Sequence, residues 1–124
     1  MVIVQKQTDR LMVEFSQPEL TMLHQSLNEI LYEYRSGKID KDFKVAEQFI
    51  QTEFERVDYL YTTAEATNFT KPIQLECSVT DIKNYRRILE RALEIFEGEL
   101  HARTGVNEDE ARVLLKTLQD FTHN

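Results

Sequence analysis

One pattern occurs twice in this chain: a short alternating stretch that leads directly into a capped amphipathic helix. The first copy is EFSQPELTMLHQSLNEIL, at residues 14–31, and the second is ECSVTDIKNYRRILERAL, at residues 76–93. Both keep the order Glu-x-Ser-x-x-acid, and both then place leucine or isoleucine at helical spacing. This repeat predicts two short strands, each followed by a similar amphipathic helix.

The serines and acids of the repeat form capping boxes. Ser16 precedes Glu19 by three residues, and Ser78 precedes Asp81 by the same spacing. In such a box the serine oxygen accepts from the third backbone N–H, while the acid reaches back to the amide of the serine. Pro18 suits a first helical turn, where no intrahelical N–H bond is lost. Helices therefore begin at both places.

The predicted fold class is α+β, mostly helical, with two similar strand-helix-helix units around a small antiparallel sheet. An internal duplication is one explanation of the two units. Two unrelated strand-helix units are the alternative, and they predict a similar fold. The predicted boundaries are 11–62 for the first unit, 72–122 for the second and 63–71 for the connecting loop, with strands at 2–5, 10–15 and 72–77.

Helix boundaries and the core follow from the spacing of apolar residues. The second helix of the first unit is expected from 42 to about 62. In the second unit one long helix runs past Leu100 to a stop at Gly105, and Asn107 with Glu110 forms a third capping box. The predicted core consists of Leu23, Leu27, Ile30, Leu31, Phe49, Ile50, Tyr85, Leu89, Leu93, Phe96, Leu114, Leu115 and Leu118.

Length and cysteine content limit the class of protein. A chain of 124 residues is expected to form a single domain, 1–124, with one core. Cys77 is the only cysteine, so no intramolecular disulfide can form, and no apolar run is long enough to span a membrane. We therefore expect a cytoplasmic protein with no membrane partner. Cys77 itself is interpreted as a small buried hydrophobe, with a reactive thiol before a helix as the alternative.

No catalytic or metal constellation is recognisable in the sequence. His24, His101 and His123 stand apart, and none has the helical spacing of a metal site with another histidine or a cysteine. Glycine-rich phosphate loops and the nucleophile elbow are missing as well. We predict no enzyme activity, no metal and no cofactor.

Charge separates the remaining candidate surfaces. The net charge of −7 disfavours nucleic acid, which needs cations to replace its counterions, and suits a basic protein partner. The predicted partner-binding residues are the acids Glu29, Glu33, Glu47, Glu55 and Asp58. The alternative is a local basic patch formed by Lys83, Arg86, Arg87 and Arg91.

Two segments resemble a diffuse group of short bacterial proteins. These segments are ELTMLHQSLNEI, at residues 19–30, and ELHARTGVNEDEARVLLKTL, at residues 99–118. In that group a capped Glu-Leu-x-x-Leu helix carries Leu-Asn-Glu-Val, followed by Arg-x-Gly and a Glu-Ala-x-x-Leu-Leu helix. Many of its members look like immunity proteins encoded beside bacterial toxins, whereas others are uncharacterised. Here the two motifs are divided between the two copies of the repeat.

The leading functional hypothesis is a non-enzymatic acidic module that binds a protein partner, in particular an immunity-like protein that neutralises a basic bacterial toxin. One alternative is a nucleic-acid-associated regulatory protein that uses the basic patch. Another is a homo-oligomeric structural protein that associates through Tyr59 and Tyr61.

Overall fold

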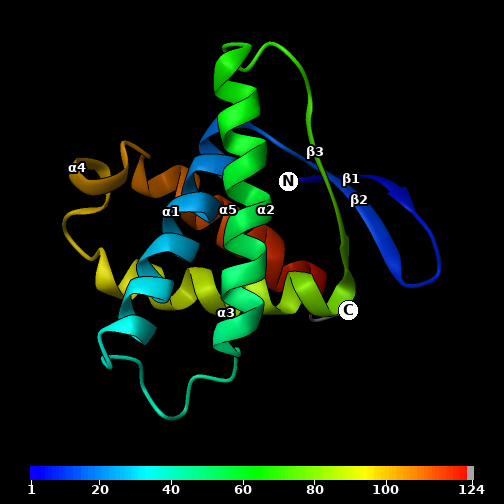
Figure 1. Ribbon diagram of the computed structural model, residues 1–124. Coiled ribbons are helices and arrows are strands. Elements are labelled where there is room, and N and C mark those ends of the chain that lie inside the picture. Colours follow the sequence, from blue (N-terminus) through cyan, green and yellow to red (C-terminus); the bar gives the residue numbers. More distant parts are fainter. Residues whose placement is uncertain (123–124) are drawn as a thin grey trace.

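The computed structural model describes residues 1–122 and confirms a mostly helical α+β fold with a small antiparallel sheet (Figure 1). Among these residues no helix is both long and apolar enough to cross a membrane. The elements are β1 (Val2–Lys6), β2 (Arg10–Phe15), α1 (Gln17–Arg35), α2 (Glu47–Ala66), β3 (Ile73–Ser78), α3 (Val79–Ile95), α4 (Leu100–Thr104) and α5 (Glu108–Thr122).

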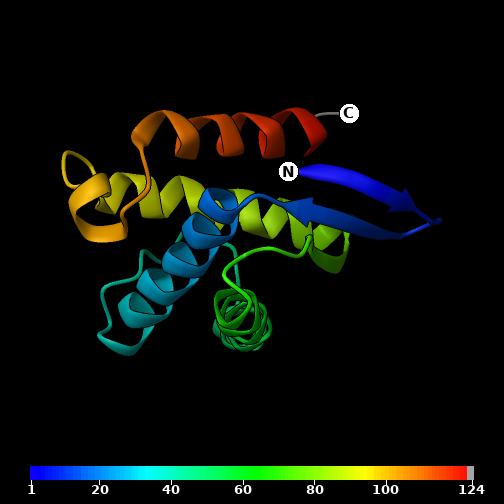
Figure 2. The same cartoon turned by 90° about the horizontal axis from the view of Figure 1, so that it is seen from above.

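The sheet has the order β1-β2-β3, with antiparallel pairing on both sides of β2. Strand alternation explains which face is buried, because successive side chains point to opposite faces. The pairs Leu11–Cys77, Val13–Leu75 and Phe15–Ile73 all face the core. The β1–β2 hairpin projects past the helices, and β1 is exposed along its whole length (Figures 1 and 2).

Helix α1 lies at the centre of the fold. It contacts α2, α3, α4, α5 and β2, so it is covered on more than one side. Met22 is fully buried even though it lies outside the leucine stripe, and Ser26 is buried beside the same core. In Figure 2, α2 is seen end-on, while α3 and α5 lie across it and roughly parallel to each other.

Most of the predicted core is confirmed. Phe49, Leu93 and Leu115 are only partly buried, because each lies at the margin of its helix's packed face. Strand residues and Val45, which the helical pattern did not include, complete a single cluster with the buried helical residues. The predicted core residues that are buried are Leu23, Leu27, Ile30, Leu31, Ile50, Tyr85, Leu89, Phe96, Leu114 and Leu118.

Two of the three predicted capping boxes, those of the repeat, are present. The Ser16 oxygen accepts from the amide of Glu19 while the Glu19 carboxylate accepts from the amide of Ser16, and Ser78 and Asp81 do the same. At the start of α5, Asn107 instead accepts from the amide of Asp109 at 2.8 Å. The helix start was therefore placed correctly, but Asn107 acts as a simple N-cap in place of the predicted box with Glu110.

The helix predicted from 42 to about 62 was wrong at both ends. α2 begins at Glu47 rather than 42, because residues 40–43 form a turn in which the carboxylate of Asp40 accepts from the amide of Asp42. It then continues to Ala66, so the connection to β3 is shorter than the predicted 63–71. Asn68 and Phe69, both with positive φ, end it by turning the chain back toward β3.

The long helix predicted in the second unit is broken. α3 ends at Ile95, and Gly98 adopts a left-handed conformation with φ +78° before α4 begins. The turn buries Leu100 and brings Arg103 over the Phe96 ring, with its guanidinium carbon 4.7 Å from the ring centroid. Gly105, at φ +74°, ends α4 as predicted for a glycine stop.

The two units have corresponding arrangements. β2 leads into α1 and β3 leads into α3, each through a serine cap, and the two strands are antiparallel neighbours. α2 packs on α1, and α5 packs on α3. This agreement meets the requirement of the duplication hypothesis, which remains a hypothesis because α4 has no counterpart in the first unit.

Candidate functional site

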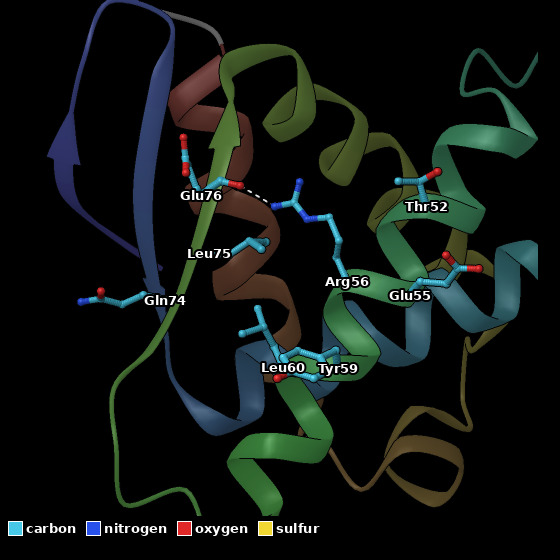
Figure 3. Close-up of a pocket in the computed structure, with 8 residues that line it drawn as sticks. All are labelled: Thr52, Glu55, Arg56, Tyr59, Leu60, Gln74, Leu75 and Glu76. Atoms are coloured by element: carbon cyan, nitrogen blue, oxygen red, sulfur yellow. Dashed lines mark hydrogen bonds between the residues drawn. The ribbon is translucent and has the colours of Figure 1, made fainter.

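A groove lies between α2 and the outer edge of β3 (Figure 3). Its volume is about 460 Å³, and it is lined by Thr52, Glu55, Arg56, Tyr59 and Leu60 of α2 and by Gln74, Leu75 and Glu76 of β3. The helix residues lie on one side of α2 because their spacing of three or four places side chains one above another. We call these eight residues the α2–β3 groove.

Tyr59 is the aromatic residue among the eight that line the groove. Its exposed fraction is 73%, whereas Leu75 at the opposite wall is buried. Glu55 lies one turn before Tyr59 and is exposed. The side-chain amide of Gln51 donates to its carboxylate at 2.8 Å. An aromatic ring and a carboxylate at this spacing form neighbouring binding groups on a helix surface.

Arg56 crosses the groove. Its guanidinium donates to the backbone oxygen of Glu76, and Figure 3 shows this bond spanning α2 and β3. The same guanidinium lies 3.5 Å from the carboxylate of Glu53, which is almost buried. On the far side of the strand, the Glu76 carboxylate pairs with Arg10 at 3.0 Å. Both cations near the groove are therefore engaged by the protein itself.

The structure does not gather the five predicted acids into one surface. Glu29 pairs with Arg103 of α4 at 3.1 Å, and Glu33 is buried and pairs with Arg91 of α3 at 3.2 Å. Both carboxylates hold helices together. Sequence spacing could not show this, because their partners are 74 and 58 residues away.

The other three predicted acids lie on α2. Glu47 and Glu55 are exposed, while Asp58 is half-buried and holds His24. Glu55 alone belongs to the α2–β3 groove, and Glu47 lies at the start of the same helix. α2 contains five carboxylates, Glu47, Glu53, Glu55, Asp58 and Glu65, against one cation, Arg56, which gives it a formal charge of −4.

The predicted basic patch is partly neutralised, through Arg86 and Arg91. Arg86 lies 3.5 Å from Glu90, and Arg91 binds both Glu33 and Glu94. Arg87 is half-buried and donates to the side chain of Asn84. The three arginines line a hollow of about 350 Å³ together with Asp40, Asp42, Phe43, Lys44, Glu90 and Glu94. Lys83 is exposed and lies outside it.

His24 of α1 packs against aromatic residues of α2, and sequence reasoning missed this contact. The His24 ring stacks on Tyr61 with a centroid distance of 4.7 Å and on Phe54 at 5.5 Å. Its Nε2 lies 2.8 Å from a carboxylate oxygen of Asp58. Phe54, Asp58 and Tyr61 follow the spacing i, i+4, i+7 on one face of α2, which was the available signal. Because Tyr61 is stacked and only partly exposed, the predicted Tyr59–Tyr61 surface is reduced to Tyr59.

Cys77 is a buried core residue. Burial, followed by the nearby Asp81 carboxylate, raises the pKa of its thiol from 9.0 to about 12. The thiol therefore stays protonated at neutral pH, as the interpretation of a buried hydrophobe requires. Within residues 1–122, no group of three or more His, Cys, Asp or Glu side chains is placed to hold a metal ion.

No protein-family model, curated protein sequence or solved structure matches this chain.

Proposed function

We propose that this protein is a non-catalytic binding module that holds a basic protein partner against α2, in the way an immunity protein holds a toxin. The observation that carries the proposal is the exposed Tyr59–Glu55 pair in the α2–β3 groove. Tyrosine is a frequent anchor at protein interfaces, since it contributes a large contact area with little conformational freedom to lose.

The charge of the helix supports the same partner class. α2 carries a formal charge of −4 within a protein of net charge −7. Exposed carboxylates attract a basic protein over distances of about 8–10 Å at physiological salt, which mainly raises the association rate. Glu47 and Glu55 take this role, because Glu29 and Glu33 are engaged inside the fold.

The nucleic-acid alternative is disfavoured by the ion pairs of Arg86 and Arg91. A phosphate would compete with Glu90 for Arg86 and with Glu33 and Glu94 for Arg91. It would also approach the acids that line the same hollow. Binding there would forgo much of the counterion release that drives protein–nucleic acid association.

Affinity capture from the native cell extract tests the proposal. The bait is the protein itself, and the bound material is analysed by mass spectrometry with and without nuclease. We expect a basic protein that is retained after nuclease treatment and released more readily as salt is raised. The double variant Glu47→Lys/Glu55→Lys should lose it.

The control variant is Asp9→Lys/Glu97→Lys, in which two exposed acids outside α2 are reversed. Each double variant changes the net charge by +4, from −7 to −3, so the two differ only in where the charge is changed. Equal loss in both would reduce the effect to overall charge and contradict an α2 site. Recovery of RNA that depends on Arg86 and Arg87 would support the alternative and overturn the proposal.

A further inference from the structure

The backbone direction of β3 can be worked out from the hairpin. The amide of Gln7 donates to the carbonyl of Arg10 at 2.8 Å, so the backbone groups of Arg10 point toward β1. Successive residues of a strand point their N–H and C=O groups to opposite sides. The backbone N–H and C=O groups of Leu11, Val13 and Phe15 therefore point toward β3, where their partners are Cys77, Leu75 and Ile73. It follows that Gln74, Glu76 and Ser78 point their backbone groups away from β2.

Two hydrogen bonds agree with this direction. The outward amide of Ser78 is occupied by the carboxylate of Asp81, and the outward carbonyl of Glu76 is occupied by Arg56. Among residues 1–122, no hydrogen bond reaches the outward N–H and C=O of Gln74 or the N–H of Glu76. An unpaired strand edge therefore lies open between Arg56 and the loop before β3.

We propose that this edge receives an extended, basic segment of the partner protein as an additional β-strand in the α2–β3 groove. The inference rests on the proposed function and names the manner of binding. Unpaired edge groups are a template for another strand, and peptide recognition by strand addition uses them. Residues 74–76 span about 7 Å, which is enough for one repeat of ladder bonds.

The chemistry of the groove selects the side chains of the added strand. Tyr59 and Glu55, one turn apart on α2, both line the groove, and Figure 3 shows the Tyr59 ring extending toward β3 and the Glu55 carboxylate on the outer side of the helix. A lysine or arginine fits both, because its charge pairs with the carboxylate and its stem packs on the aromatic face. Alternate residues face Leu60 and Leu75, which suits an apolar side chain.

The opposite edge of the sheet is less suitable. β1 is exposed, but its register shifts between Ile3 and Gln5, which marks an irregularity of the bulge type. Such an irregularity interrupts the row of edge groups and discourages further pairing. β3 pairs with β2 without a shift from Ile73 to Ser78.

The test uses a library of blocked octapeptides with alternating Val or Ile and Lys or Arg. Matched libraries replace the cations with Glu, or N-methylate every second amide in either frame. We expect millimolar or tighter binding of basic peptides, at least tenfold weaker binding of acidic ones, and loss in one N-methyl frame only. Absence of binding at 1 mM, or equal loss in both frames, overturns strand addition.

Amide hydrogen exchange locates the bound peptide. At saturation, exchange at Gln74 and Glu76 should slow at least tenfold, while exchange at Lys6 on the β1 edge stays unchanged. The variant Gln74→Pro removes the outward N–H without touching the β2 ladder, as edge prolines do, and Gln74→Ala is its control. Retained binding by a folded Gln74→Pro variant argues against the proposal, and the N-methylated peptides decide it if that variant does not fold.

The experiments distinguish failure of the proposed binding function from failure of strand addition. A captured partner that is lost in Glu47→Lys/Glu55→Lys but unaffected by Gln74→Pro would leave the binding function standing and overturn strand addition. Loss in both variants, with Gln74→Ala unchanged, is the result that we expect.

Discussion

The hydroxyl of Tyr85 in α3 donates a hydrogen bond to the carboxylate of Glu53 in α2, and both side chains are buried. This bond lies inside the core, behind the helix that lines the α2–β3 groove. A buried carboxylate is costly unless it is paired, and here Tyr85 and Arg56 supply the partners. The position of α2 therefore depends on a small polar network as well as on apolar packing.

Removing the hydroxyl should destabilise the fold. The variant Tyr85→Phe keeps the ring but removes the shorter of the two hydrogen bonds to Glu53, whose exposed fraction is 4%, and leaves it only Arg56 at 3.5 Å. We expect a loss of about 1–3 kcal/mol in the free energy of unfolding, measured by urea denaturation. Glu53→Gln retains an acceptor for Tyr85 and should cost less. A loss under about 0.5 kcal/mol in Tyr85→Phe would show that the carboxylate finds another partner.

Stability should fall in alkaline solution because of Cys77. Burial raises the pKa of its thiol from 9.0 to about 12, so above pH 9 the unfolded chain loses this proton while the folded chain keeps it. The folded state then binds more protons, and stability declines by up to about 1.4 kcal/mol per pH unit until the folded pKa is reached.

The variant Cys77→Ala isolates this effect. It should lose some stability at pH 7 but show a shallower decline between pH 9 and pH 10 in urea denaturation. Above pH 10 Tyr85 contributes in the same direction, since burial and Glu53 raise the pKa of its hydroxyl. An unchanged slope in Cys77→Ala would contradict the assignment to this thiol.

Local signals allowed much of the fold to be predicted. Ser16 with Glu19 and Ser78 with Asp81 each complete a cap within three residues, so nothing distant could alter them. β2 and β3 were recognisable because their apolar, buried residues alternate with mostly polar ones. Met22 was missed because a leucine stripe marks one packed face, whereas α1 is covered on several sides.

The candidate site depended on distant contacts and was only partly predictable. Glu33 and Glu55 look alike in sequence, yet Glu33 is buried and paired with Arg91 of α3, whereas Glu55 is exposed on α2. The stacking of His24 between two aromatic residues and the open edge of β3 both arise from pairing across the fold. Charge and spacing identified α2 as acidic but could not show which of its acids are free.

Truncating Met22 tests the central position of α1. Its exposed fraction is 0%, like that of Leu27, although only Leu27 lies in the leucine stripe. Met22→Ala and Leu27→Ala should each cost about 2–5 kcal/mol in the free energy of unfolding. Val113→Ala, at a residue that is 64% exposed, should stay within about 0.5 kcal/mol. A Met22→Ala variant as stable as Val113→Ala would contradict the packing of α1 on several sides and would support a single packed face.

The sign of one glycine substitution distinguishes a broken helix from a continuous one. Gly98 has φ +78°, and a Cβ added there would meet nothing within 4 Å, so backbone strain alone decides the effect. Gly98→Ala should destabilise the fold by about 1 kcal/mol, because alanine disfavours the left-handed conformation. In a continuous helix over the same residues the substitution would stabilise it by about 1 kcal/mol instead. Gly105→Ala is the matched control, since a left-handed stop is expected there in either case. Urea denaturation of the two variants side by side gives the answer: destabilisation of both supports the turn between α3 and α4, and stabilisation by Gly98→Ala alone would replace it with one long helix.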